Sequence, residues 1–135
     1  DKYGEFGLGD ERAHNLVRIK SLTDRNVPVS FHSDFSMAPI EPLTLVWTAV
    51  NRIASEGLAY SADQKIDVYT ALKAITIGAA RTINQEHKIG SIKVGKKANF
   101  VILDKNPMRV EPQTIKDIKV YGTVFSGKLS IPISH

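Results

Sequence analysis

Apolar and polar positions change their spacing along this chain, and the change predicts a helical first part and a strand-rich second part. Apolar residues recur three or four positions apart in residues 16–25, 43–55 and 65–81, which is helical spacing. Between the first two of these helices, residues 27–33 begin with the apolar, β-branched character of a buried parallel strand. A helix, a tight turn and a buried strand in this order indicate an αβ repeat.

Two of these helices have recognisable starts. Pro42 can occupy the first position of the second helix, where its missing N–H costs nothing. Ser61 and Gln64 match a capping box, in which the two side chains satisfy the first free amides of a helix. We therefore expect the third helix to begin just after Ser61.

After residue 84, glycine and proline interrupt shorter apolar runs. Four of these runs have the length and composition of strands: residues 91–94, 99–104, 118–125 and 128–131. Turn residues separate them, at Gly95, at Asn106-Pro107 and at Ser126-Gly127. The pattern divides the chain into residues 1–83 and residues 84–135.

Composition excludes several classes of protein. The 135 residues are 42% hydrophobic and 24% charged, which is typical of one globular, soluble domain. The net charge of +4 is mild and the basic residues are scattered, so we expect no nucleic-acid partner. The absence of cysteine excludes disulfides and thiolate metal sites. No apolar run approaches the roughly 20 residues that span a bilayer, and no signal peptide is visible, so we expect no membrane partner and a cytoplasmic location.

The candidate chemistry lies in the stretch VPVSFHSDFSMAPIEP, residues 27–42. Asp34 stands where the apolar run gives way to an irregular, proline-containing loop, and a carboxylate at such a place is held firmly and still reaches a ligand. The common alternative is an aspartate that caps a helix or a turn. His32, two residues earlier, shares its strand face with Asp34. His32 is either a group that orients Asp34 or a core histidine bonded to a neighbour.

Three stretches carry a resemblance to a known family: residues 27–52, the run ALKAITIGAART, and the run IGSIKVGKKANFVILDKNP. Together they resemble the C-terminal third of an amidohydrolase-superfamily enzyme. The most similar pattern is that of the amidohydrolase-3 group, which includes YtcJ-like and AepA-like proteins and N-substituted formamide deformylases. The first and last stretches occur in the family's order and at its usual separation.

The resemblance implies an α/β fold, a metal-dependent (β/α)8 TIM barrel joined to a small composite β-sandwich. Residues 27–33 would be the eighth barrel strand, and residues 43–55 and 65–81 the helices that close the barrel. Residues 84–135 would be the C-terminal share of the sandwich. Active sites of such barrels lie at the carboxyl ends of the strands, which is where Asp34 falls.

The resemblance also implies roles for single residues. Asp34 matches the aspartate that serves as metal ligand and proton shuttle, taking a proton from the attacking water and giving it to the leaving nitrogen. His32 would support Asp34 from behind. Arg52 matches the arginine of the family's AV.R run and would shape the mouth of the site, or else it is an arginine of the surface or of a helix terminus. Asn99 stands where the family usually has aspartate, in the sandwich.

The rest of the family's site is absent from this sequence. Its His-x-His pair has no counterpart among the four histidines, His14, His32, His87 and His135. One carboxylate does not make a zinc site, which usually has three or four protein ligands. We therefore expect a fragment of a longer enzyme, whose missing N-terminal region supplies the remainder of the barrel. The 135 residues alone are expected to bind no catalytic metal and to be inactive.

Two functions follow as hypotheses. In the first, the parent protein is a metal-dependent hydrolase, with zinc as the expected cofactor, that acts on the C–N bond of a small amide or N-formyl compound. In the second, the chain is a non-catalytic regulatory or binding protein derived from the hydrolase scaffold. Separated from the rest of a barrel, the apolar residues 27–31 would expose unpaired edges that favour association, and a homo-oligomer is one expected outcome.

Overall fold

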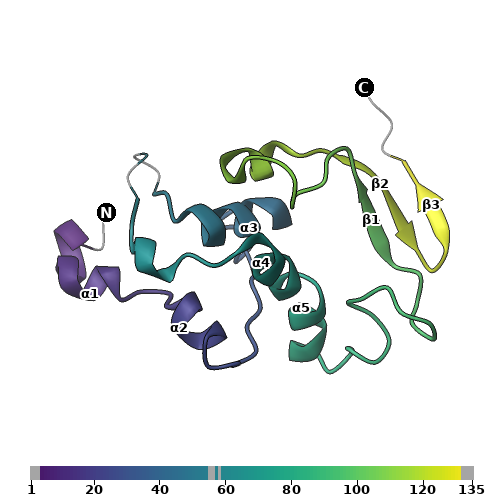
Figure 1. Ribbon diagram of the computed structural model, residues 1–135, viewed down its shortest axis with the longest axis horizontal. Helices are drawn as coiled ribbons and strands as arrows, with labels where there is room; N and C mark the ends of the chain where they lie inside the picture. Colours follow the sequence, from purple (N-terminus) through teal and green to yellow (C-terminus); the bar gives the residue numbers. More distant parts are fainter. Residues whose placement is uncertain (1–3, 55–56, 58, 132–135) are drawn as a thin grey trace.

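The chain folds into short helices followed by a small antiparallel sheet. The computed structural model describes residues 4–54, 57 and 59–131. Figure 1 shows the helices extending from one end of the molecule to its middle, and the sheet at the other end. In chain order the elements are η1 (Gly4–Leu8), α1 (Asp10–His14), α2 (Ile19–Thr23), α3 (Pro42–Asn51), η2 (Ala62–Gln64), α4 (Val68–Ala74), α5 (Ile77–Thr82), β1 (Phe100–Leu103), η3 (Pro112–Asp117), β2 (Val120–Phe125) and β3 (Lys128–Ser130). Within the described ranges, no helix is long and apolar enough to cross a membrane.

The core lies where α3 meets α2, α4 and the 3₁₀ helix η3. Val46 of α3 and Ile115 of η3 are completely buried. The indole N–H of Trp47 donates a hydrogen bond of 2.8 Å to the carbonyl of Gln113, which fixes η3 on α3. The buried cluster consists of Ile19, Val46, Ala49, Ile66, Ala71 and Ile115. The core therefore crosses the boundary predicted at residue 84, because η3 returns from the second part of the chain to cover the helices.

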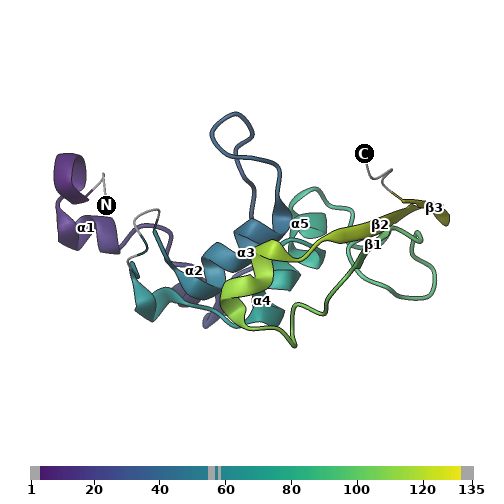
Figure 2. The same ribbon diagram turned by 90° about the horizontal axis from the view of Figure 1, so that it is seen from above.

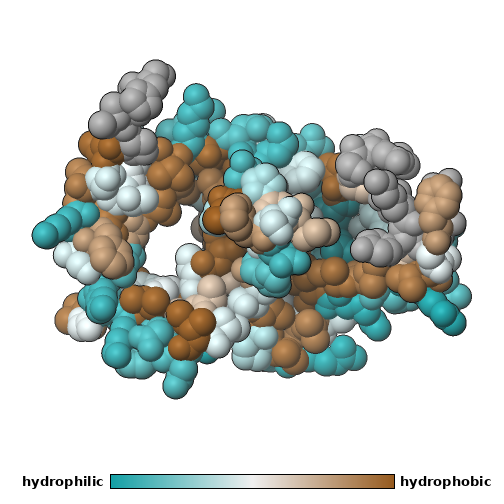
Figure 3. Space-filling view, turned by 180° about the vertical axis from the view of Figure 1, so that it is seen from behind, coloured by the Kyte–Doolittle hydropathy of each residue, from teal (hydrophilic) through white to brown (hydrophobic). Residues whose placement is uncertain are grey.

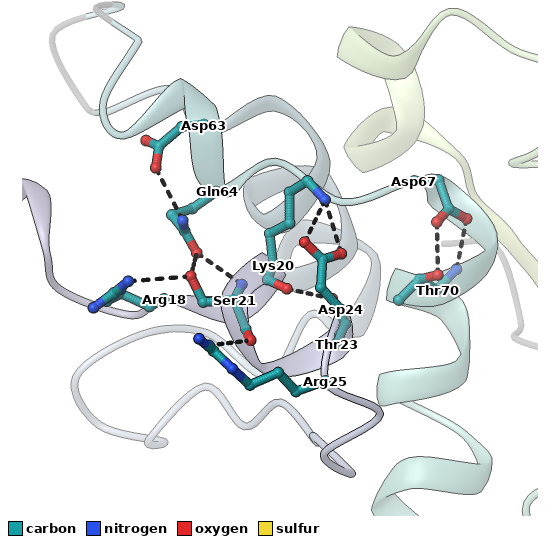
Figure 4. A network of polar contacts seen from close by, with 10 residues as sticks. All are labelled: Arg18, Lys20, Ser21, Thr23, Asp24, Arg25, Asp63, Gln64, Asp67 and Thr70. Atoms are coloured by element: carbon teal, nitrogen blue, oxygen red, sulfur yellow. Dashed lines mark hydrogen bonds and ion pairs between the residues drawn. The ribbon is translucent and has the colours of Figure 1, made fainter.

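The predicted capping box is wrong. Ser61 has φ 50° and caps nothing; its hydroxyl donates to the carbonyl of His14 instead. The side-chain oxygen of Gln64 accepts hydrogen bonds from the amide and the hydroxyl of Ser21, both 3.1 Å long (Figure 4). Ser61 and Gln64 are both buried and make contacts with residues distant in the chain. A local sequence pattern does not reveal such contacts.

The predicted helix over residues 65–81 is present as two helices. Asp67 caps α4, since its carboxylate accepts hydrogen bonds from the amide and the hydroxyl of Thr70 (Figure 4). α4 ends before Thr76, whose backbone leaves the helical region at φ −121° and ψ −96°. The hydroxyl of Thr76 donates to the carbonyl of Leu72 at 2.7 Å and satisfies an acceptor at this end. The helix α5 then begins in a new direction.

The other two predicted helices are shorter than expected. Val17 has φ 53°, so α2 begins only at Ile19. Arg52 has φ 53°, and this left-handed residue follows the end of α3 at Asn51, four residues before the predicted limit. Left-handed residues commonly lie at helix ends, where glycine is their usual sequence signal. Neither Val17 nor Arg52 is a glycine, so the sequence did not predict these two ends.

Residues 27–33 do not form a strand in this structure. The prediction that they are a barrel strand is therefore wrong for this chain by itself. They follow α2 and pass close to α5, where the carbonyl of Val29 lies 2.4 Å from the point at which Gly78 would carry a Cβ atom. A parallel strand needs neighbours supplied by other βα units. The described part of this chain holds no second strand beside residues 27–33, so the ladder does not form.

The sheet confirms three of the four predicted C-terminal strands. β2 pairs with both β1 and β3, in the order β1-β2-β3 and with every pair antiparallel. Ser126 and Gly127 form the two-residue turn between β2 and β3, with φ of 50° and 82°, as the type I′ turns of hairpins require. The side-chain oxygen of Asn99 accepts a 2.8 Å hydrogen bond from the amide of Ser126, which ties the turn to the start of β1.

The predicted strand over residues 91–94 is wrong. These residues form a loop, and the side chains of Ile92 and Val94 are among the most exposed apolar groups of the molecule. Lys96 holds this loop by donating hydrogen bonds from Nζ to the carbonyls of Glu86 and Ile89. Seen from behind, the sheet end of the molecule shows several hydrophobic residues at its surface among hydrophilic ones (Figure 3).

Candidate functional site

Asp34 lies in the segment that joins α2 to α3, and its side chain is exposed. Its backbone is left-handed, with φ 53°. Its carbonyl accepts a 2.8 Å hydrogen bond from the amide of Met37, which closes a turn directly after the carboxylate. Figure 2 shows this segment projecting away from the helices as a narrow loop. The Asp34 carboxylate is therefore accessible to a ligand, while the turn that Met37 closes holds the Asp34 backbone in place.

His32 contacts Asp34 through the backbone. The amide of Asp34 donates a hydrogen bond of 3.2 Å to Nδ1 of His32. Because Nδ1 accepts, the neutral ring carries its proton on Nε2. The His32 side chain is exposed, so it is not a core histidine in this chain. The structure thus brings His32 and Asp34 together, and their contact is with the Asp34 amide.

A hollow of about 230 Å³ lies at the base of the loop. Its walls come from the segment before Asp34, from the start of α3 and from the end of α4: Phe31, His32, Ser33, Ile40, Glu41, Pro42, Leu45 and Ile75. His32 and Ile40 lie on either side of Asp34 in the chain and both line this hollow. A small molecule seated there would contact both an imidazole and apolar side chains.

Arg52 lies elsewhere. It follows the last residue of α3, whereas Asp34 precedes the first, and the ten residues of α3 span about 15 Å. The guanidinium donates to the carbonyls of Leu16 and Val17 at 3.3 and 3.4 Å. Burial lowers the pKa of Arg52, and the carboxylate of Asp63 opposes that shift. These contacts support the helix-terminus alternative, in which Arg52 fastens the N-terminal segment to the end of α3.

The donor set for a metal ion is incomplete. Among the residues that the structure describes, no three His, Asp or Glu side chains come together as a metal site would require. His14 is occupied, because its Nδ1 bonds to the carbonyl of Asp10 and its ring stacks on Tyr60 at 4.2 Å. His135 lies outside the described residues. The described residues therefore do not form a complete metal site by themselves.

The sequence alone does not mark the apolar side chains that follow Asp34 as functional. Phe35, Met37 and Ile40 are all largely exposed. A signal was present, since no charged residue occurs between Asp34 and Glu41. Their exposure could not be inferred from it, because an apolar, uncharged run more often indicates burial.

The comparisons with known proteins decide the family. A family model described as "Amidohydrolase family" matches residues 4–131. The chain belongs to the amidohydrolase family. This confirms the resemblance that the sequence motifs indicated.

Individual curated proteins also match over most of this chain. An N-substituted formamide deformylase of Arthrobacter pascens is 30% identical over 122 residues, which are 90% of this chain and 22% of the relative. Protein LONG AFTER FAR-RED 3 of Arabidopsis thaliana is 36% identical over 129 residues, which are 93% of this chain and 22% of the relative. The chain thus spans less than a quarter of the length of these curated relatives.

One solved structure also matches, an amidohydrolase from Thermotoga maritima. It is 18% identical in sequence, with a TM-score of 0.39. The match covers 90% of this chain and 35% of the Thermotoga chain. The family assignment accordingly rests on the sequence match over residues 4–131.

Proposed function

We propose that this chain is the C-terminal portion of a metal-dependent hydrolase that acts on non-peptide C–N bonds of the amide or N-formyl type. The observation that carries the proposal is the exposed carboxylate of Asp34, fixed in a turn, in a chain that matches the amidohydrolase family almost throughout. The name of the Arthrobacter relative, N-substituted formamide deformylase, supports the N-formyl class of substrate.

Asp34 has the chemistry for the central role. A carboxylate held within hydrogen-bond reach can accept a proton from an attacking water and pass it to a leaving nitrogen. The turn closed by Met37 fixes the backbone of Asp34, and its exposure leaves the oxygens accessible. His32 supports this placement through the Asp34 amide.

The expected cofactor is a divalent metal, zinc, for which Asp34 is one ligand and residues outside this chain are the others. Such a metal lowers the pKa of bound water towards ~7. The proposed partners are a small amide-like substrate and the remainder of the barrel. The paired strands that residues 27–33 lack here would come from that remainder.

The test begins with the protein from its natural source. Its intact mass is expected to exceed the 14.9 kDa of this chain several-fold. The purified protein should then hydrolyse a simple N-substituted formamide or amide, and Asp34→Asn should lower kcat/KM by about 10² to 10⁴, the range of a general base.

Asp117→Asn is the matched control, because this exposed aspartate forms an ion pair of 2.9 Å with Lys116 and lies outside the candidate site. It should leave kcat/KM within about twofold of the wild type, as surface changes usually do. A natural mass of 14.9 kDa with no hydrolysis of any amide would contradict the proposal and favour the non-catalytic binding protein.

A further inference from the structure

The loop that follows Asp34 displays an unusual amount of apolar surface. The side chains of Phe35, Met37 and Ile40 are 73%, 81% and 68% exposed. No charge lies between Asp34 and Glu41. Single exposed apolar residues are ordinary, but three within six positions, beside a candidate catalytic carboxylate, form a patch that indicates binding.

This apolar surface is held in place by the loop's own contacts. The amide of Met37 bonds to the carbonyl of Asp34 at 2.8 Å, and Phe35 and Ala38 form an isolated bridge. The amide of Glu41 bonds to the carbonyl of Pro39 at 3.0 Å, which closes the loop before α3. The loop stands clear of the helices in Figure 2, and its three apolar side chains are largely exposed.

The patch is continuous with the hollow at the base of the loop. Ile40 belongs to both, and Phe31 adds a second apolar wall to the hollow. Asp34 lies between these two residues in the chain. A molecule whose reacting atom lies against the Asp34 carboxylate would thus have apolar surface next to it.

We infer that Phe35, Met37 and Ile40 form an apolar wall that receives an uncharged alkyl or aryl substituent on the nitrogen of the scissile bond. This inference rests on the proposed function. A nitrogen that receives its proton from Asp34 lies about 3 Å from the carboxylate, and its substituent begins one bond further on. The residues that follow Asp34 in the chain are those of this loop, and their apolar side chains are exposed. A negatively charged substituent would lose hydration there without gaining an ion pair, so the wall selects against it.

The test compares two substrates on the full-length protein: N-methylformamide and N-hexylformamide. The measured quantity is the ratio of kcat/KM for the hexyl compound to that for the methyl compound. Phe35→Ala and Met37→Ala should each lower this ratio about 10-fold or more, since each removed methylene contact in an apolar site counts for roughly that much. Ile92→Ala, at an equally exposed apolar residue outside the loop, should leave the ratio within about twofold.

The outcomes separate the two claims. If the wild-type protein hydrolyses both formamides and neither alanine variant lowers the ratio, the wall is refuted and the proposed function stands. An equal loss on both substrates also refutes the wall, because it shows a structural role for the loop. A wild-type protein that hydrolyses neither compound, nor any other amide, removes the proposed function and the wall with it.

Discussion

The backbone amide of Asp34 donates a hydrogen bond to Nδ1 of His32, across 3.2 Å. The contact joins two residues of a short segment that forms no strand, and it places an imidazole nitrogen beside the backbone of the candidate catalytic residue. In the neutral ring, an accepting Nδ1 corresponds to the tautomer with its proton on Nε2.

This contact predicts a graded effect of substitutions at His32. His32→Leu removes the acceptor and should lower kcat/KM of the full-length enzyme by about 2- to 10-fold, the range of one hydrogen bond. His32→Asn places an amide oxygen near the position of Nδ1 and should restore most of the loss. Steady-state kinetics of the two variants decides the matter. Equal activity of the leucine and asparagine variants would mean that the hydrogen bond has no part in positioning Asp34.

The cap of α4 predicts a pH-dependent contribution to stability. Hydrogen bonds from the hydroxyl and the amide of Thr70 lower the pKa of Asp67 below its usual value. Asp67→Ala should lower the free energy of unfolding by about 0.5–2 kcal/mol at neutral pH, as the loss of a helix N-cap does. Chemical unfolding followed by circular dichroism measures the difference.

The sign of the pH effect follows from the lowered pKa. The folded carboxylate binds a proton less readily than the unfolded one, whose pKa is about 3.9. The stabilisation is therefore complete above that pH and is lost as the pH falls through the lower pKa of the folded state. The difference between wild type and Asp67→Ala should shrink in that acidic range. Asp117→Ala, which caps no helix, is the control; a difference for Asp67→Ala that stays constant down to the lowest pH would contradict the prediction.

Gly78 predicts a steric effect. A Cβ atom at this position would lie 2.4 Å from the carbonyl oxygen of Val29, which is backbone and has little freedom to move aside. Gly78→Ala should therefore destabilise the chain by roughly 1–3 kcal/mol, as overpacking does. Gly7→Ala is the matched control, because no atom lies within 4 Å of its Cβ position. If the two variants unfold at the same denaturant concentration, the close approach of residues 27–29 to α5 is wrong.

The incomplete donor set predicts that the 135-residue chain does not retain zinc. After equilibration with zinc and dialysis, elemental analysis should find well under one equivalent, because fewer than three ligands do not hold this metal. Asp34→Asn should leave that residual amount unchanged. One equivalent retained by the wild-type chain, and lost in Asp34→Asn, would show that these residues suffice for a site.

The sequence by itself determined some of the local elements and the family. Alternating and helical patterns placed β1, β2, β3 and α3 closely, since these segments obtain their order from spacing, turn residues and a proline at the helix start. The turn at Ser126-Gly127 followed from composition alone. The motifs around Asp34 and after residue 88 indicated the amidohydrolase family, which the match over residues 4–131 confirms.

Only the tertiary structure decided the rest, because those features depend on partners distant in the chain. Residues 27–33 have the composition of a strand, yet no described neighbour pairs with them. Gln64 looks like half of a capping box, but it bonds to Ser21, 43 positions earlier. The exposure of Phe35 and Met37 contradicts their apolar character, and a pattern of residue types cannot show which apolar groups the fold leaves uncovered.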